Sequence, residues 1–323
     1  MRLVGSPASL VNNALMAHLY IYSPSGAVRD KTGFKRAVAR LKAQGHDVEL
    51  DPAALASHTR FAGDDEMRLA AIARAAASGA NVALTTRGGY GLTRLLPKLP
   101  YAKLAKAAEK GTAFVGLSDF TAMQLALLAC EGVATWAGPA LMEDWACEGE
   151  PDEIMQACFD DLLDGHGEGT GWRLPVADVK AHPALGTEDG WGLNKATLWG
   201  GNLSVLTSMV GTPYFPEVKN GLLFLEDVAE HPYRIERMLT QLLHAGVLGK
   251  QKAIILGQFN RYQLTPHDKG FKLASVVDWL RTQVKVPVLT GLPFGHVPTK
   301  VLLPVGRQVQ LMVQQREALL FWG

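Results

Sequence analysis

The chain has 323 residues, of which 48% are hydrophobic and 20% charged, so it can bury a sizeable core and is not disordered. It has 32 basic and 31 acidic residues, a net charge of +1, which argues against binding nucleic acid or a membrane through bulk charge. Its three cysteines cannot form a disulfide framework, and Cys130 is expected to be a small core residue of an apolar helix. At about 100 to 200 residues per domain, the length favours two domains.

The first half of the chain alternates strands and helices in the way that a parallel α/β sheet requires. Strands are predicted at 19–22, 47–50, 81–86 and 112–117, and helices at 34–44, 65–79, 103–110 and 120–130. The repeated βα pattern predicts a doubly wound domain over residues 1–145.

The second half has a different pattern. Residues 146–190 are predicted to connect two domains, with a helix over 152–163 followed by a glycine-dense loop or hinge at 165–171. Beyond residue 190, short strands and turns surround one clear amphipathic helix that begins near Pro232. These features predict a second, smaller α+β domain over 191–323.

No stretch reaches the roughly 18 to 20 apolar residues that span a bilayer. Asn12 and Asn13 interrupt the only apolar stretch near the N-terminus that resembles a leader peptide. A cytoplasmic location is therefore expected.

Ser118 lies where an apolar strand runs directly into an apolar helix, in the segment 114–120. A serine on such a turn presents its hydroxyl at the carboxyl edge of the sheet, where open α/β sheets bind ligands. The N–H of Asp119, at the start of the helix, could stabilise an oxyanion. Alternatively, Ser118 or Asp119 merely caps the helix.

Three further segments could contribute to a site. The glycine-rich loop 87–91 follows a strand and could expose N–H groups, or it is an ordinary turn. Glu226 and Asp227 end an apolar strand, and Asp227 could instead cap the helix near Pro232. His296 lies on a turn rich in glycine and proline. Ser118, Glu226 and His296 together would supply a nucleophile, an orienting acid and a base.

Long motifs give the chain a specific resemblance. They include SPSG (23–26), RGGYGLTRLLPKL (87–99), GLSDFTAM (116–123), WGGNLSVLTSMVGTPY (199–214), LLFLEDVAEHPYRIERML (222–239) and GLPFGH (291–296). In these motifs the chain resembles the LD-carboxypeptidase family of serine peptidases, which includes murein tetrapeptide carboxypeptidases and microcin C self-immunity peptidases.

The resemblance implies a flavodoxin-like N-terminal domain with the nucleophile and a C-terminal domain with the acid and histidine. It identifies Ser118, Glu226 and His296 as the triad, and the N–H groups of Asp119 and Gly89 as oxyanion donors. It implies no cofactor or metal, a muropeptide substrate and a homodimer.

The implied reaction removes the terminal D-Ala from a murein tetrapeptide, after L-Lys or meso-diaminopimelate, during cell-wall recycling. Arg87, Tyr90 and Arg234 are candidate substrate contacts, although Arg94 and Arg237 could equally bind the free carboxylate. A first alternative is a peptidase of the same family that detoxifies a peptidyl-nucleotide antibiotic, for which Trp172 or Trp191 could stack on adenine. A second is a non-catalytic two-domain ligand-binding protein.

Overall fold

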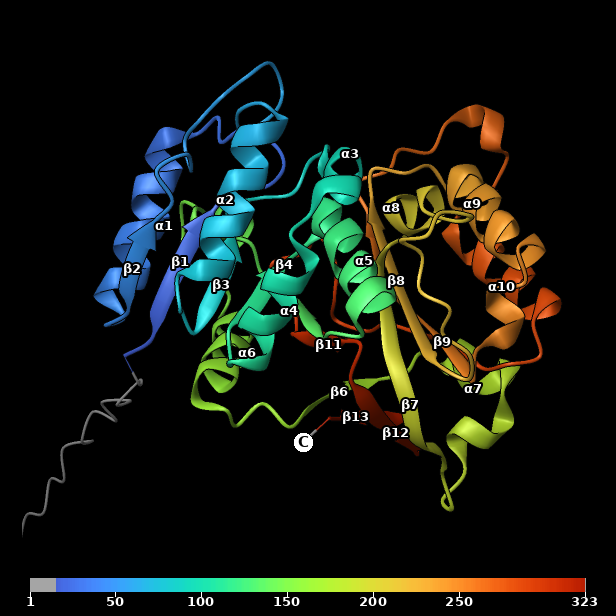
Figure 1. Ribbon diagram of the computed structural model, residues 1–323. Helices are drawn as coiled ribbons and strands as arrows, with labels where there is room; N and C mark the ends of the chain where they lie inside the picture. The colour runs from blue at the N-terminus through green and yellow to red at the C-terminus, as the bar shows by residue number, and fades with distance from the viewer. Residues whose placement is uncertain (1–15, 323) are drawn as a thin grey trace, which may run out of the picture.

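The structure, a computed structural model, describes residues 16–322 and contains two β-sheets with helices packed around them (Figure 1). Most of the segment examined for a leader peptide, residues 1–15, lies outside the described residues. Among the helices of the described part, none is long and apolar enough to cross a membrane.

The first sheet has the strand order β11-β5-β4-β3-β1-β2. Its parallel strands are β1 (His18–Tyr22), β2 (Asp47–Leu50), β3 (Val82–Thr85), β4 (Ala113–Gly116) and β5 (Thr135–Ala137). The helices that alternate with them are α1 (Lys31–Ala43), α2 (Asp65–Ala77), α3 (Leu92–Leu95), α4 (Tyr101–Glu109) and α5 (Thr121–Glu131). The order 2-1-3-4-5 is that of flavodoxin-like sheets, so the predicted fold of this domain is confirmed.

The sixth strand of this sheet comes from the far end of the chain. β11 (Leu303–Val305) pairs antiparallel with β5, with Leu303 opposite Ala137 and Val305 opposite Thr135. Pro304 is tolerated because β11 is an edge strand and need not donate on its outer side. A segment predicted to belong wholly to the second domain therefore completes the first sheet.

The second sheet has the order β10-β9-β8-β7-β12-β13-β6. Its strands are β6 (Gly169–Arg173), β7 (Trp191–Asn202), β8 (Leu222–Val228), β9 (Ala253–Asn260), β10 (Val288–Thr290), β12 (Gln308–Gln314) and β13 (Glu317–Phe321). The half from β7 to β10 is parallel, and the half from β7 to β6 is antiparallel.

The presence of β6 corrects the prediction of a loop over 165–171. The second half of the predicted loop, from residue 169 on, belongs to the strand β6. This strand pairs with β13 from Gly169 opposite Phe321 to Arg173 opposite Glu317. Pairing with a strand more than 140 residues later leaves no trace in the local composition, which predicts only a turn.

The remaining helices cover the second sheet and the connection to it. They are α6 (Glu153–Asp164), α7 (Val176–Ala181), α8 (Leu203–Ser208), α9 (Pro232–His244) and α10 (Leu273–Gln283). The predicted amphipathic helix is α9, which buries Ile235, Leu239 and Leu242. The core position predicted for Cys130 is wrong: it lies in the last turn of α5, where it is exposed.

The two sheets meet at α5, which packs against β7 and α8 (Figure 1). Phe120, Leu203 and Leu225, which follow or lie toward the carboxyl ends of β4, β7 and β8, belong to one continuous cluster of buried side chains. The carboxyl ends of β4, β7 and β8 are thereby held together by a shared core.

Candidate active site

Ser118 lies on a strained turn between β4 and α5. Its φ angle is +66°, in the left-handed region that non-glycine residues seldom occupy. Such strain persists where the surrounding structure enforces it, and it is frequent at functional sites. The helix-cap alternative is not supported, because no side chain caps either the 3₁₀ turn η2 (Ser118–Phe120) or α5.

The carboxylate of Asp119 holds two neighbouring loops in place. Its Oδ2 accepts hydrogen bonds from Ser25 Oγ at 2.7 Å and from the Leu92 N–H at 3.0 Å. Burial raises the pKa of Asp119, although these hydrogen bonds oppose the shift. The turn after β1, the loop after β3 and the turn after β4 therefore meet at this side chain.

The glycine loop 87–91 packs directly against Ser118. A Cβ on Gly88 would lie 2.6 Å from Ser118 Cβ, so only glycine fits there without a shift. The Gly88 carbonyl accepts a hydrogen bond from the Gly26 N–H at 3.2 Å. Because the C=O and N–H of a trans peptide point in opposite directions, the Gly89 N–H points away from Gly26.

Glu226 and His296 form a buried pair. Glu226, near the end of β8, has no exposed surface, and its Oε2 lies 2.8 Å from His296 Nδ1. Burial lowers the pKa of His296, but the hydrogen bond and charge of Glu226 outweigh it, so the pKa is raised above its ordinary value. When Nδ1 donates its proton to the Glu226 carboxylate, Nε2 of the neutral imidazole is the nitrogen that can accept one.

The loop of His296 is fixed from two further sides. Asn260 Nδ2 donates to the His296 carbonyl at 2.8 Å. Gly295 has φ of +140°, and a Cβ there would lie 3.2 Å from Glu226 Oε2. The glycine therefore allows the loop to approach the carboxylate closely.

Asn202 was not predicted as a site residue, yet it connects the two halves of the site. At the end of β7 its side chain donates to Glu226 Oε1 at 3.1 Å and to Asp227 Oδ1 at 3.0 Å. Its backbone N–H donates to Thr121 Oγ1, three residues after Ser118. The signal available in the sequence was an asparagine at a strand end followed by a helix, since Asn202 also caps α8.

One alternative predicted that Asp227 caps α9, and the structure shows that it does not. Its Oδ2 accepts hydrogen bonds from the backbone N–H and the hydroxyl of Ser204, in the first turn of α8. The cap of α9 is His231.

A cavity of about 670 Å³ opens at this junction. Its walls include Gly89, Tyr90, Ser118, Asp119, Asn202 and Asp227. Ser118 and the Glu226–His296 pair are thus linked through the walls of one cavity, because Asn202 lines it and hydrogen-bonds Glu226.

The predicted substrate contacts lie in different places. Tyr90 is 45% exposed on the wall of this cavity. Arg234 is half exposed and pairs with Glu230 at 3.6 Å. Arg94 pairs with Asp65 at 2.9 Å, and Arg87 lines a smaller neighbouring cavity.

The two tryptophans considered for adenine stacking are packing residues. Trp172 is 7% exposed, and its indole N–H donates to the Thr290 carbonyl. Trp191, in β7, packs against the core of the second sheet. Neither of them lines the Ser118 cavity.

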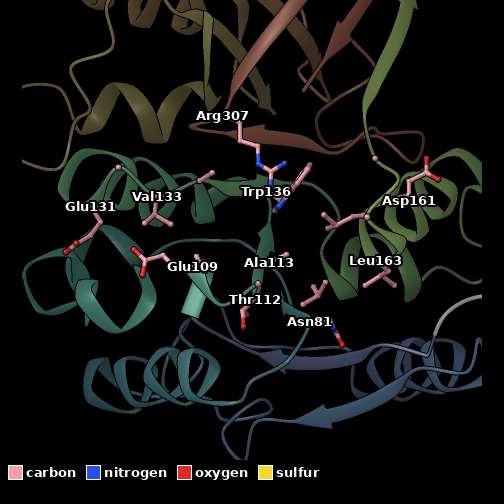
Figure 2. Close-up of a pocket in the computed structure, with 18 residues that line it drawn as sticks. Asn81, Glu109, Thr112, Ala113, Glu131, Val133, Trp136, Asp161, Leu163 and Arg307 are labelled. Carbon is pink, nitrogen blue, oxygen red and sulfur yellow. The ribbon is translucent and has the colours of Figure 1, made fainter. Parts of the chain in front are cut away.

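Another cavity, of about 560 Å³, lies at the opposite edge of the first sheet, where β3 and β4 begin (Figure 2). Arg307 lies over the Trp136 ring there, 5.1 Å from its centroid. It contains none of the predicted site residues. Within residues 16–322, no group of three or more His, Cys, Asp or Glu side chains is arranged to hold a metal ion.

Comparisons with known proteins agree with this architecture. The LD-carboxypeptidase N-terminal domain matches residues 19–138, and the LD-carboxypeptidase C-terminal domain matches residues 195–311. The chain belongs to the LD-carboxypeptidase family. The crystal structure of muramoyltetrapeptide carboxypeptidase from Oxalobacter formigenes is 38% identical, with a TM-score of 0.80, and the match covers 94% of this chain and 97% of that one.

Other members of the LD-carboxypeptidase family match over most of their length. A Bacillus subtilis protein named "Probable murein peptide carboxypeptidase" is 27% identical over 285 residues, 88% of this chain and 85% of the relative. The microcin C7 self-immunity protein MccF of Escherichia coli is 27% identical over 240 residues, 69% of this chain and 68% of the relative. This chain is therefore a member of the LD-carboxypeptidase family whose relatives include one named for murein peptides and one named for self-immunity to microcin C7.

Proposed function

We propose that this protein is a serine carboxypeptidase that releases the terminal D-Ala from murein tetrapeptide. The observation that supports it most is the strained Ser118, which shares a cavity with the network holding the Glu226–His296 pair. A ligand-binding protein without catalysis would need neither strain at a serine nor a buried imidazole paired with a carboxylate. The 38% identity to a muramoyltetrapeptide carboxypeptidase supports the substrate class.

In the proposed first step, His296 Nε2 takes the hydroxyl proton of Ser118 while Oγ attacks the carbonyl carbon before the terminal D-Ala. Glu226 orients the imidazole and stabilises its cationic form, for which the 2.8 Å contact is suited. The C–N bond then breaks, and His296 returns its proton to the departing amine of D-Ala. Water hydrolyses the resulting acyl-enzyme, with His296 again acting as the base.

The developing oxyanion is proposed to be held by the N–H groups of Asp119 and Gly89. Asp119 is the second residue of a helical turn, where N–H groups lack partners within the helix. The Gly89 N–H points away from Gly26. Gly89 and Asp119 both line the Ser118 cavity. Losing one such donor typically costs about 2.7 to 4 kcal/mol of barrier.

The antibiotic-detoxifying alternative receives less support from this chain. Both tryptophans that could stack on a nucleobase are engaged in packing. The solved wild-type apo structure of MccF is 22% identical and shows a common fold only.

The decisive experiment incubates the purified protein with L-Ala-γ-D-Glu-meso-diaminopimelate-D-Ala and follows D-Ala by mass spectrometry. The Ser118→Ala variant is the matched control. Release by the parent alone supports both reaction and nucleophile, whereas release by both proteins would remove Ser118 from the mechanism. Absence of release by either would overturn the murein substrate, and aminoacyl-nucleotide amides would be tested next.

We further propose that this activity serves the recycling of wall fragments in the cytoplasm and that the protein acts as a homodimer. Fractionation would test the location, and light scattering coupled to gel filtration would test the dimer.

A further inference from the structure

A cavity of about 290 Å³ lies beside the glycine loop, on the side of Arg87. We call it the arginine pocket; its walls include Val28, Arg29, Asp30, Arg87, Met142 and Glu143. It begins one residue from the surroundings of Ser118, because Gly88 follows Arg87 and packs directly on the serine. The Ser118 cavity is more than twice as large.

Among the described residues, the Arg87 side chain of this pocket has no ion-pair partner. Its Nε is buried and has no hydrogen-bond partner. Its backbone is fixed by the strand before it and by the packing of Gly88. Arg29, in contrast, donates to Ser57 Oγ and to the Thr59 carbonyl. A buried donor without a partner is costly, and a guanidinium is shaped to pair with a carboxylate through two hydrogen bonds.

The pocket also contains acidic groups, which decide what kind of ligand fits it. Asp30 accepts a hydrogen bond from the Gly33 N–H and caps α1. Glu143 is exposed, and its charge contributes to the raised pKa of His296 after the larger effects of burial and Glu226. Glu143 therefore lies within electrostatic reach of the imidazole. A cavity with both a free guanidinium and a carboxylate suits an amino acid better than a simple anion.

We propose that the arginine pocket is the subsite for the leaving group, in which Arg87 binds the free carboxylate of the terminal residue. This inference rests on the proposed function. When the C–N bond breaks, the departing nitrogen takes one proton from His296 Nε2 and a second from water, and Glu143 faces the resulting ammonium of the zwitterionic product. The small pocket matches a single small amino acid, and the larger Ser118 cavity matches the acyl part of the peptide.

The test compares two substrates, the tetrapeptide with a free terminal carboxylate and the same peptide as its C-terminal amide. A charge-assisted hydrogen bond contributes about 1.5 to 3 kcal/mol, which corresponds to about 10- to 150-fold. Arg87→Met should lower kcat/KM for the free acid by that factor and leave the amide within about twofold. Arg173→Met, which removes an exposed arginine paired with Glu317, is the matched control and should retain the parent's preference for the acid.

Arg87→Lys is a second variant that keeps the positive charge but lacks the planar guanidinium. Its kcat/KM for the free acid should lie between the values of the parent and Arg87→Met, which a general loss of folding in Arg87→Met would not predict. Equal losses on both substrates, or an intact preference for the acid in Arg87→Met, would overturn the subsite while leaving the proposed function in place. If the parent releases neither D-Ala from the free acid nor D-alaninamide from the amide, the proposed function and the subsite are overturned together.

Discussion

Replacing Gly88 with alanine tests whether the geometry around Ser118 controls the reaction rate. The φ of Gly88 lies outside the left-handed region, so an alanine is strained there only by its contacts. The new Cβ would lie 2.6 Å from Ser118 Cβ and 2.9 Å from its Oγ, whereas ordinary contacts begin at 3.4 Å. The serine or the loop must therefore move by about 0.8 Å, and a misplacement near 1 Å can lower turnover about 100-fold.

The assay measures kcat and KM for D-Ala release, together with a thermal melt. We expect kcat to fall about 100-fold, with a stability loss of about 1 to 3 kcal/mol from overpacking. Gly249→Ala is the matched control, because its Cβ would meet nothing within 4 Å and its φ is unrestrictive. Full activity in Gly88→Ala, or an equal loss in Gly249→Ala, would refute the reasoning.

Two other changes have distinct expected results. Glu226→Gln should lower kcat by about 10⁴-fold, as loss of the orienting acid does in other triads. Only the smaller effects of the Glu143 and Asp227 charges would then oppose burial, so the pKa of His296 should fall and the acid limb of the kcat/KM profile should move to lower pH. An unmoved limb would contradict the pairing. Lys300→Met should destabilise the fold by about 3 to 5 kcal/mol, because Lys300 and Asp144 form a buried ion pair. Burial raises the pKa of Asp144 despite Lys300, and without the lysine the carboxyl is stable only when protonated, so urea denaturation should show a loss that grows as pH rises. Equal losses at low and high pH would contradict this view.

The sequence allowed the parallel sheet and the positions of the main site residues to be predicted because both depend on local patterns. Ser118 follows an apolar strand, and Glu226 ends one, so the carboxyl edge of a sheet was the expected place for each. The resemblance then grouped them with His296, which spacing alone left open. The structure adds the contact between His296 and Glu226.

The features that were missed depend on pairing between distant segments. The strands β6 and β11 form only because their partners arrive from elsewhere in the chain. One alternative for Asp227 was a cap of the helix near Pro232, the next helix in sequence, whereas in space Asp227 binds the start of α8. Asn202 was overlooked because its role depends on two carboxylates more than 20 residues away.

The late arrival of β11 has a consequence for the protein during its synthesis. The 165 residues between β5 and β11 must be translated before β5 gains its outer partner. At typical rates of about 5 to 20 residues per second, the nascent first sheet presents an open strand edge for about 8 to 33 s. An unpaired strand edge is a template for pairing with another chain. Neighbouring nascent chains on one polysome could therefore pair through this edge, and a chaperone that covers it during synthesis would prevent aggregation.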